Sequence, residues 1–67
     1  MLNITINGEP RQFASALTVG GLIGQLGYTG KRIAVEKHGE NVPKSLHATT
    51  QLVSGDRLEI VVAVGGG

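Results

Sequence analysis

The sequence of 67 residues contains no cysteine, no tryptophan, one tyrosine and one phenylalanine. The absence of cysteine excludes a disulfide framework, a thiolate metal site and a cysteine nucleophile. It also removes the usual indication of secretion, because disulfides persist in oxidising compartments. With so few aromatic side chains, the chain has no basis for a platform on which nucleic-acid bases could stack.

Neither sign of charge predominates, since six Lys and Arg face five Asp and Glu, for a net charge of +1. The basic residues are scattered, which is not the electrostatic footprint of a nucleic-acid-binding protein. No apolar run approaches the roughly 20 residues that span a bilayer. The first ten residues lack the basic start and apolar block of a signal peptide. We therefore expect a cytoplasmic protein that binds neither nucleic acid nor membrane.

A catalytic constellation is missing as well, because the acids are isolated and the serines have no His and acid partners in a suggestive order. His38 and His47 lie in polar stretches and are predicted to be solvated on the surface, with no third metal ligand at a recognisable spacing. A chain this short also leaves little room for a ligand pocket of roughly 300 Å³ or more. The sequence predicts no metal site, no bound cofactor and no independent enzyme.

The first residues predict a hairpin. Residues 2–7 alternate apolar and polar side chains, which is the period of a half-buried strand. The dipeptide Asn7-Gly8 is a strong turn signal, and residues 10–14 can return as the second strand. Pro10 has no amide hydrogen for a ladder, so it belongs at the beginning of that strand or on an edge.

A helix is predicted after the hairpin, with Thr18 as its N-cap and Gly27 just beyond its end. Three further glycines inside it each cost about 0.5–1 kcal/mol relative to alanine. Such a helix needs tertiary packing to form, and its small residues allow a close approach to the sheet. Its apolar face follows the i, i+3, i+4, i+7 spacing and consists of Val19, Leu22, Ile23 and Leu26.

The second half predicts three more strands, at residues 32–37, 41–43 and 57–62. Between the last two, Leu46 is expected to anchor a single helical turn and Leu52 to fill the core. Asp56 follows Gly55 in a turn, where its carboxylate is expected to bond the turn backbone.

This order of elements implies an α+β domain, with a mixed sheet of four to five strands and one main helix on one face. The N-terminal hairpin and the last strand are expected to lie together in the centre of the sheet, with the first strand parallel to the last. The β-grasp, or ubiquitin-like, fold is one of several arrangements with this order. We expect residues 1–62 to form a single domain and residues 63–67 to form a flexible C-terminal glycine tail.

The tail ends in Gly65, Gly66 and Gly67. Residues 63–67 reach roughly 16–18 Å when extended, and the last three have no side chain, so the tail fits a narrow cleft. The α-carboxylate, with a pKa of about 3.3–3.7 in model peptides, is ionised at neutral pH. A partner with ATP could convert it to an acyl-adenylate, which a thiolate or persulfide can attack. From the residues alone, a frayed chain end or a cloning remnant explains the tail equally well.

Five stretches of the chain form a recognisable combination: "GENVPKS" (39–45), "SGDRLEIV" (54–61) and "AVGGG" (63–67), with "INGEP" and "TVGGLIGQLG" in the front half. In these stretches, and over essentially its whole length, the chain resembles the ThiS family of thiamine-biosynthesis sulfur carriers. The diglycine alone is shared with all ubiquitin-like modifiers, whereas the combination is specific. Asn41 replaces an apolar residue and His38 replaces an Asn that the family often carries, both at one edge turn away from the tail.

The resemblance implies a β-grasp fold and a sulfur-carrier function. It further implies that an ATP-dependent, ThiF-like enzyme adenylates Gly67, and that a persulfide with sulfur from cysteine converts the adenylate to a thiocarboxylate. The sulfur then passes to thiazole synthase for the thiazole ring of thiamine. ATP and zinc belong to the partner enzyme in this scheme, and the carrier itself binds no cofactor.

Other functions remain open at this stage: the small subunit of molybdopterin synthase, a ubiquitin-like protein modifier, or a binding module whose tail is incidental. Partner contacts are expected at Gly65 and Gly66, which let the tail enter the activating site without a clash, and at Val64. We also expect the solvent side of the last strand, including Val61, to dock partners. Alternatively, Val61 packs beneath a neighbouring element.

Overall fold

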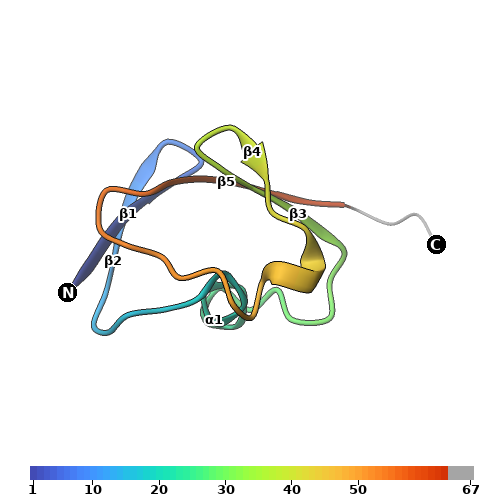
Figure 1. Ribbon diagram of the computed structural model, residues 1–67, viewed down its shortest axis with the longest axis horizontal. Helices are drawn as coiled ribbons and strands as arrows, with labels where there is room; N and C mark the ends of the chain where they lie inside the picture. The colour runs from blue at the N-terminus through green and yellow to red at the C-terminus, as the bar shows by residue number, and fades with distance from the viewer. Residues whose placement is uncertain (64–67) are drawn as a thin grey trace.

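The computed structural model describes residues 1–63. Five strands, one α-helix and one 3-10 helix follow one another within this part of the chain (Figure 1). The predicted strand at 41–43 lies one to two residues earlier, because Pro43 already caps the 3-10 helix. The elements are β1 (Leu2–Ile6), β2 (Glu9–Phe13), α1 (Val19–Gln25), β3 (Ile33–Lys37), β4 (Glu40–Asn41), η1 (Lys44–Leu46) and β5 (Arg57–Val62).

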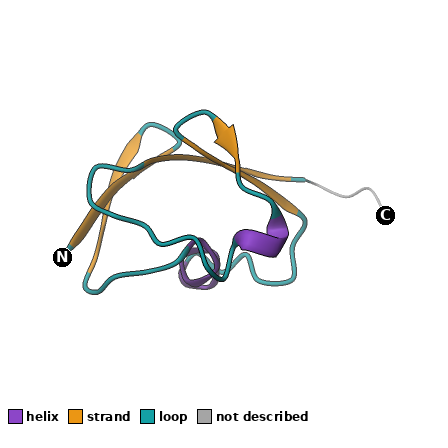
Figure 2. Cartoon of the chain, viewed as in Figure 1, coloured by secondary structure: helices purple, strands orange, loops and turns teal. Residues whose placement is uncertain are grey.

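The strands form one mixed sheet in the order β2-β1-β5-β3-β4. β5 runs parallel to β1, as predicted, and antiparallel to β3, and both hairpins are antiparallel. The expectation that the whole N-terminal hairpin lies in the centre is wrong for β2, which is an edge strand. This position suits Pro10, which cannot donate to a ladder. Figure 2 shows the sheet arched over α1 and η1, which both lie on its concave side. This is the predicted β-grasp arrangement.

The parallel ladder between β1 and β5 is short, and the side chain of Asn7 extends it. Its register covers only two residue pairs, beginning with Thr5 opposite Arg57. Beyond them, Asn7 donates from Nδ2 to the carbonyl of Ile60 (3.1 Å) and accepts at Oδ1 from the Ile60 amide (2.8 Å). Asn7 and Gly8 have φ values of 51° and 82°, so this dipeptide forms the predicted turn and also anchors the last strand.

The helix α1 begins and ends where the sequence predicts. Thr18 accepts a hydrogen bond at Oγ1 from the Gly21 amide (3.0 Å), and Gly27 beyond the last turn has a φ of 77°. The glycines of α1 are expected from the sequence to allow a close approach to the sheet. The close contact in the structure is instead between Gly20 and the backbone that follows η1. Gly20 donates to the carbonyl of His47 at 2.8 Å, and a Cβ there would lie 3.3 Å from that oxygen. In the part of the chain that the structure describes, no helix is long and apolar enough to cross a membrane.

One apolar core lies between the sheet and α1. The prediction for Leu52 is confirmed, because this side chain is buried in the core. The predicted single helical turn around Leu46 is present as η1, but Leu46 does not anchor it in the core, because this side chain is 49% exposed. The buried apolar residues are Leu2, Ile4, Ile6, Val19, Leu22, Ile23, Val35, Leu52, Leu58 and Ile60.

Candidate functional site

The outer face of β5 is the part of the predicted site that the structure describes. Because side chains alternate along a strand, Leu58 and Ile60 enter the core while the residues between them face away from α1. Val61 is 63% exposed, so the alternative that it packs beneath a neighbouring element is wrong. It lies opposite the small Ala34 of β3, which leaves its apolar side chain accessible near the end of the strand.

Charged side chains share this outer face. Glu59 of β5 lies directly opposite Glu36 of β3, and both are exposed. Arg57 is exposed two residues earlier and lies opposite Thr5 of β1. The face therefore changes along β5, from a charged start to the apolar Val61.

The chain leaves the sheet from its central strand. Beyond β5, the amide of Ala63 donates to the carbonyl of Arg32 at 2.8 Å, which fixes the point from which residues 64–67 continue. The other predicted site residues, Val64, Gly65, Gly66 and Gly67, lie outside the described residues.

Asp56 anchors the turn that leads into β5. Its side chain is buried, accepts at Oδ2 from the Val53 amide (2.9 Å), and lies 3.0 Å from His38 Nε2 and 3.9 Å from Lys37 Nζ. Burial acts to raise the pKa of Asp56, but the Val53 hydrogen bond, the His38 hydrogen bond and the Lys37 charge outweigh it and hold this pKa below its usual value. The expected bond to the turn backbone is present. His38 is exposed on the surface, as predicted, and its ring in addition bonds the buried Asp56 carboxylate, which the sequence did not predict.

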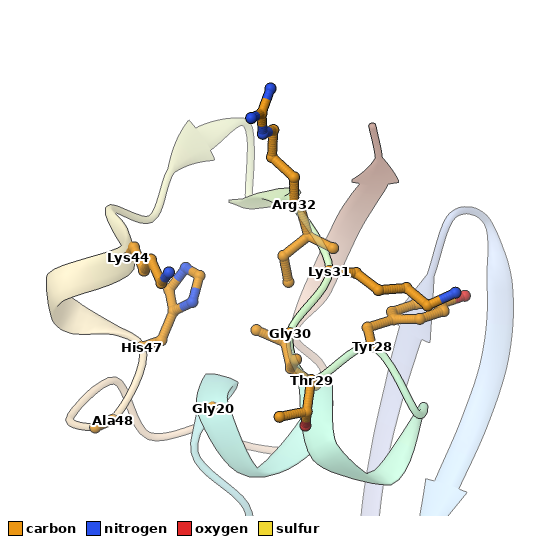
Figure 3. A pocket seen from close by; sticks show the side chains of 11 residues that line it. Gly20, Tyr28, Thr29, Gly30, Lys31, Arg32, Lys44, His47 and Ala48 are labelled. Atoms are coloured by element: carbon orange, nitrogen blue, oxygen red, sulfur yellow. The ribbon is translucent and has the colours of Figure 1, made fainter. Parts of the chain in front are cut away.

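An open groove of about 570 Å³ lies between α1, the loop before β3 and η1, so the expectation of little room for a pocket is also wrong (Figure 3). Its cationic residues are Lys31, Arg32 and Lys44, with His47 beside Lys44. His47 is half-buried and donates from Nε2 to the carbonyl of Val42 at 3.0 Å, which corrects the prediction of a solvated side chain. We call this feature the basic groove.

A family model described as the ThiS family matches residues 4–67. The chain belongs to the ThiS family. A crystal structure of a thiamine biosynthesis protein (ThiS) from Geobacter metallireducens has a TM-score of 0.83 and 29% identity, and the match covers 98% of this chain and all of that one. An NMR structure of a thiamine biosynthesis protein from the same organism also has a TM-score of 0.83, with 30% identity, covering 98% of this chain and 88% of that chain.

Among curated relatives, a thiazole synthase from Paramagnetospirillum magneticum is 46% identical to this ThiS-family chain over 66 residues. The match covers 98% of this chain but only 20% of that protein, so the chain spans a fifth of its relative's length. The protein ycf40 of Pyropia yezoensis is 35% identical, and 98% of this chain and 93% of that one are covered. The family match confirms the predicted resemblance to the ThiS family, and the two similar structures share the fold of this chain.

Two features of this ThiS-family protein were not predicted from its sequence. The link between His38 and Asp56 joins residues 18 positions apart, which the antiparallel pairing of β3 with β5 brings together. The basic groove combines two segments without regular periodicity, around residues 28–33 and 44–48. Its only sequence signals are the adjacent pair Lys31-Arg32 and the glycine at position 20, which permits the contact with His47.

Proposed function

We propose that this protein carries sulfur for the thiazole ring of thiamine on the carboxylate of Gly67. The observation that carries the proposal is that the ThiS family model matches through residue 67, and so includes the glycine tail. The relatives named thiazole synthase support the choice of acceptor. The proposal requires Gly67 to be the end of the chain when it reacts.

The proposed chemistry takes place in a partner enzyme of the ThiF type. A carboxylate oxygen of Gly67 attacks the α-phosphorus of ATP, and pyrophosphate leaves. The terminal sulfur of a protein persulfide then attacks the acyl carbon, and AMP leaves. A second thiol attacks the resulting disulfide bond, so a disulfide of the two thiols forms and the thiocarboxylate remains on Gly67. The thiocarboxylate sulfur is the nucleophile that thiazole synthase accepts.

The residues of this chain supply a rigid base and a thin tail. β5 is paired on both sides in the sheet, and the Ala63–Arg32 hydrogen bond holds the start of the tail. Gly66 lacks a Cβ beside the reacting carbonyl, so the partner's cleft can close around the backbone. The sequence contains no cysteine, and no thiol of the chain itself can therefore capture the activated Gly67.

Intact mass spectrometry tests this proposal directly. The protein is incubated with a ThiF-type adenylating enzyme, ATP, cysteine and a cysteine desulfurase. We expect a mass gain equal to the exchange of one oxygen for one sulfur, and no gain after deletion of Gly67. Absence of the gain, with the enzyme competent on another carrier, would refute the sulfur-carrier proposal.

The substitution Gly66→Val should block adenylation while the domain stays folded. Gly24→Val is the matched control, because a Cβ at Gly24 meets only the Thr29 hydroxyl at 3.8 Å. Normal adenylation of Gly66→Val would contradict the proposed role of the tail. Transfer of labelled sulfur from the thiocarboxylate to thiazole synthase identifies the acceptor. Transfer to a pterin precursor, or a lysine conjugate ending in this tail, would instead identify one of the alternatives.

We also propose that the outer face of β5 contacts these partners, since Val61 is exposed on the strand that continues into the tail. Val61→Asn should weaken partner binding without unfolding the protein. The matched control is Val53→Asn, because Val53 is 59% exposed and lies before the start of β5. Equal binding by the two variants would rule out this docking face.

A further inference from the structure

The basic groove is not used by the function proposed above, although it lies beside the start of the tail. Figure 3 shows Lys44 and His47 on one wall, facing the segment from Thr29 to Arg32 on the other. Ile23 and Ile33 contribute apolar side chains to the lining of the groove. The groove therefore has a partly apolar lining, with Lys44 and Arg32 at its rim, whereas the side chain of Lys31 extends away from Lys44 and His47 (Figure 3).

Positive charge at this groove is not balanced locally. Lys31, Arg32 and Lys44 supply half of the chain's six Lys and Arg residues, and none of residues 1–63 that line the groove is acidic. Within residues 1–63 the ion pair between a Lys or Arg and an acid joins Lys37 to Asp56, away from the groove. Although the net charge is only +1, the charges are unevenly distributed: the groove is basic, whereas Glu36 and Glu59 lie on the outer face of the sheet.

The groove is joined to the tail through the backbone. Arg32, on the rim, accepts the amide hydrogen of Ala63, and the next residue, Ile33, pairs with Val62. η1 and the end of β5 lie on the same side of the molecule (Figure 1). A protein that encloses residues 64–67 is therefore brought close to the rim of the groove.

The contacts favour a protein segment over a small anion as the occupant. The three cationic side chains belong to exposed residues, and in the described part of the chain no buried side-chain nitrogen or oxygen lacks a hydrogen-bond partner. His47 already uses Nε2 for the Val42 carbonyl. An acidic peptide suits this surface, because its carboxylates can meet Lys44 and Arg32 on opposite rims while apolar side chains cover Ile23 and Ile33.

We propose that the basic groove docks an acidic segment of the enzyme that adenylates the tail, an inference that rests on the function proposed above. That enzyme is the first protein to receive the tail in the proposed route. Complementary charge raises the rate of encounter and fixes orientation more than it changes a chemical step. An acidic segment of the enzyme would repel the carboxylate of the tail, and the cationic side chains of the groove offset this repulsion.

The test measures adenylation by pyrophosphate release, using the full chain, a ThiF-type enzyme and ATP. Lys44→Glu and Arg32→Glu should each raise the KM for the carrier about fivefold at low salt, as expected for an exposed charge pair. The double variant should raise it further, and kcat should stay within about twofold of wild type because rim charges act on association. The increase should shrink between about 0.01 M and 0.15 M salt, as the Debye length falls from about 30 Å to 8 Å.

Arg11→Glu is the matched control, since it makes the same change of charge on the edge strand β2, away from the groove. Lys44→Arg should keep the wild-type KM, and thermal unfolding should show that all variants are folded. If Lys44→Glu and Arg11→Glu change KM equally, only net charge matters and the docking proposal fails. If wild-type protein is not adenylated at all, the proposed function fails first and the docking proposal fails with it.

Discussion

Replacing Asp56 with Asn should destabilise the protein at neutral pH by removing one buried negative charge. The carboxylate accepts a hydrogen bond from the Val53 amide and one from the His38 ring, and lies 3.9 Å from the Lys37 ammonium. Asn is nearly the same shape and keeps one oxygen that can accept from Val53. The substitution therefore measures the contribution of the negative charge and of the oxygen that accepts from His38.

The size of the effect follows from these contacts. A hydrogen bond to a charged group contributes about 1.5–3 kcal/mol, and a neutral one about 1 kcal/mol. The contact with Lys37 is long and partly exposed, so it adds about 0.5 kcal/mol. We expect Asp56→Asn to lower the free energy of unfolding by about 2–3 kcal/mol. For a domain of this size, that corresponds to a fall in Tm of roughly 10–20 °C.

The pH dependence has a definite sign. Because the pKa of Asp56 is lowered in the folded state, its stabilisation is complete above the unfolded value of about 3.9. It is lost as the pH falls through the folded value, since the folded protein must then take up a proton that the unfolded chain already holds. The difference in stability between wild type and Asp56→Asn should therefore close as the pH falls below about 4.

Urea unfolding followed by circular dichroism at pH 7 and at about pH 2.5 measures this difference. Glu9→Gln serves as the control, because Glu9 is exposed at the beginning of the edge strand β2. The reasoning is wrong if Asp56→Asn costs less than about 0.5 kcal/mol at pH 7. It is also wrong if the difference persists unchanged at the acidic pH.

Three further substitutions test the fold by urea unfolding. Asn7→Ala should cost about 1–3 kcal/mol, because it leaves the Ile60 amide and carbonyl without their side-chain partner; no loss would contradict a role in anchoring β5. Leu58→Ala should lower the free energy of unfolding by about 2–5 kcal/mol, since Leu58 is fully buried. A smaller decrease would mean that the core relaxes into the cavity left by the side chain. Glu59→Gln should stabilise the protein at low salt by about 0.3 kcal/mol, because it relieves repulsion with Glu36; destabilisation would point to a favourable contact of this carboxylate.

Local chemistry accounts for the parts of the fold that the sequence predicts. Strict alternation of Leu2, Ile4 and Ile6 identifies β1, and Asn7-Gly8 specifies the turn after it. Thr18 and the apolar spacing after it identify α1 despite three glycines, because the helix is stabilised by packing on the sheet. Each of these signals lies within a few residues of the feature that it determines.

The features that the sequence did not predict depend on contacts between distant segments. Residue spacing cannot indicate that His38 lies beside Asp56, because the register of β3 and β5 decides it. Leu46 is apolar, yet one turn of 3-10 helix offers no periodicity from which its direction could be inferred. The groove likewise requires two loops to face each other across α1, which composition alone does not specify.

The central position of β5 has a consequence for how the chain acquires its fold. Its pairing with β1 joins Thr5 to Arg57, so a loop that spans most of the chain must close before the sheet is complete. Such non-local pairing slows folding relative to the size of a domain. Until β5 is made and docks, β1 and β3 each present an open edge flanked by buried-type side chains such as Ile4 and Val35. A nascent chain that pauses before residue 57 is therefore most prone to aggregate. This risk falls once β5 has been synthesised and pairs with β1 and β3.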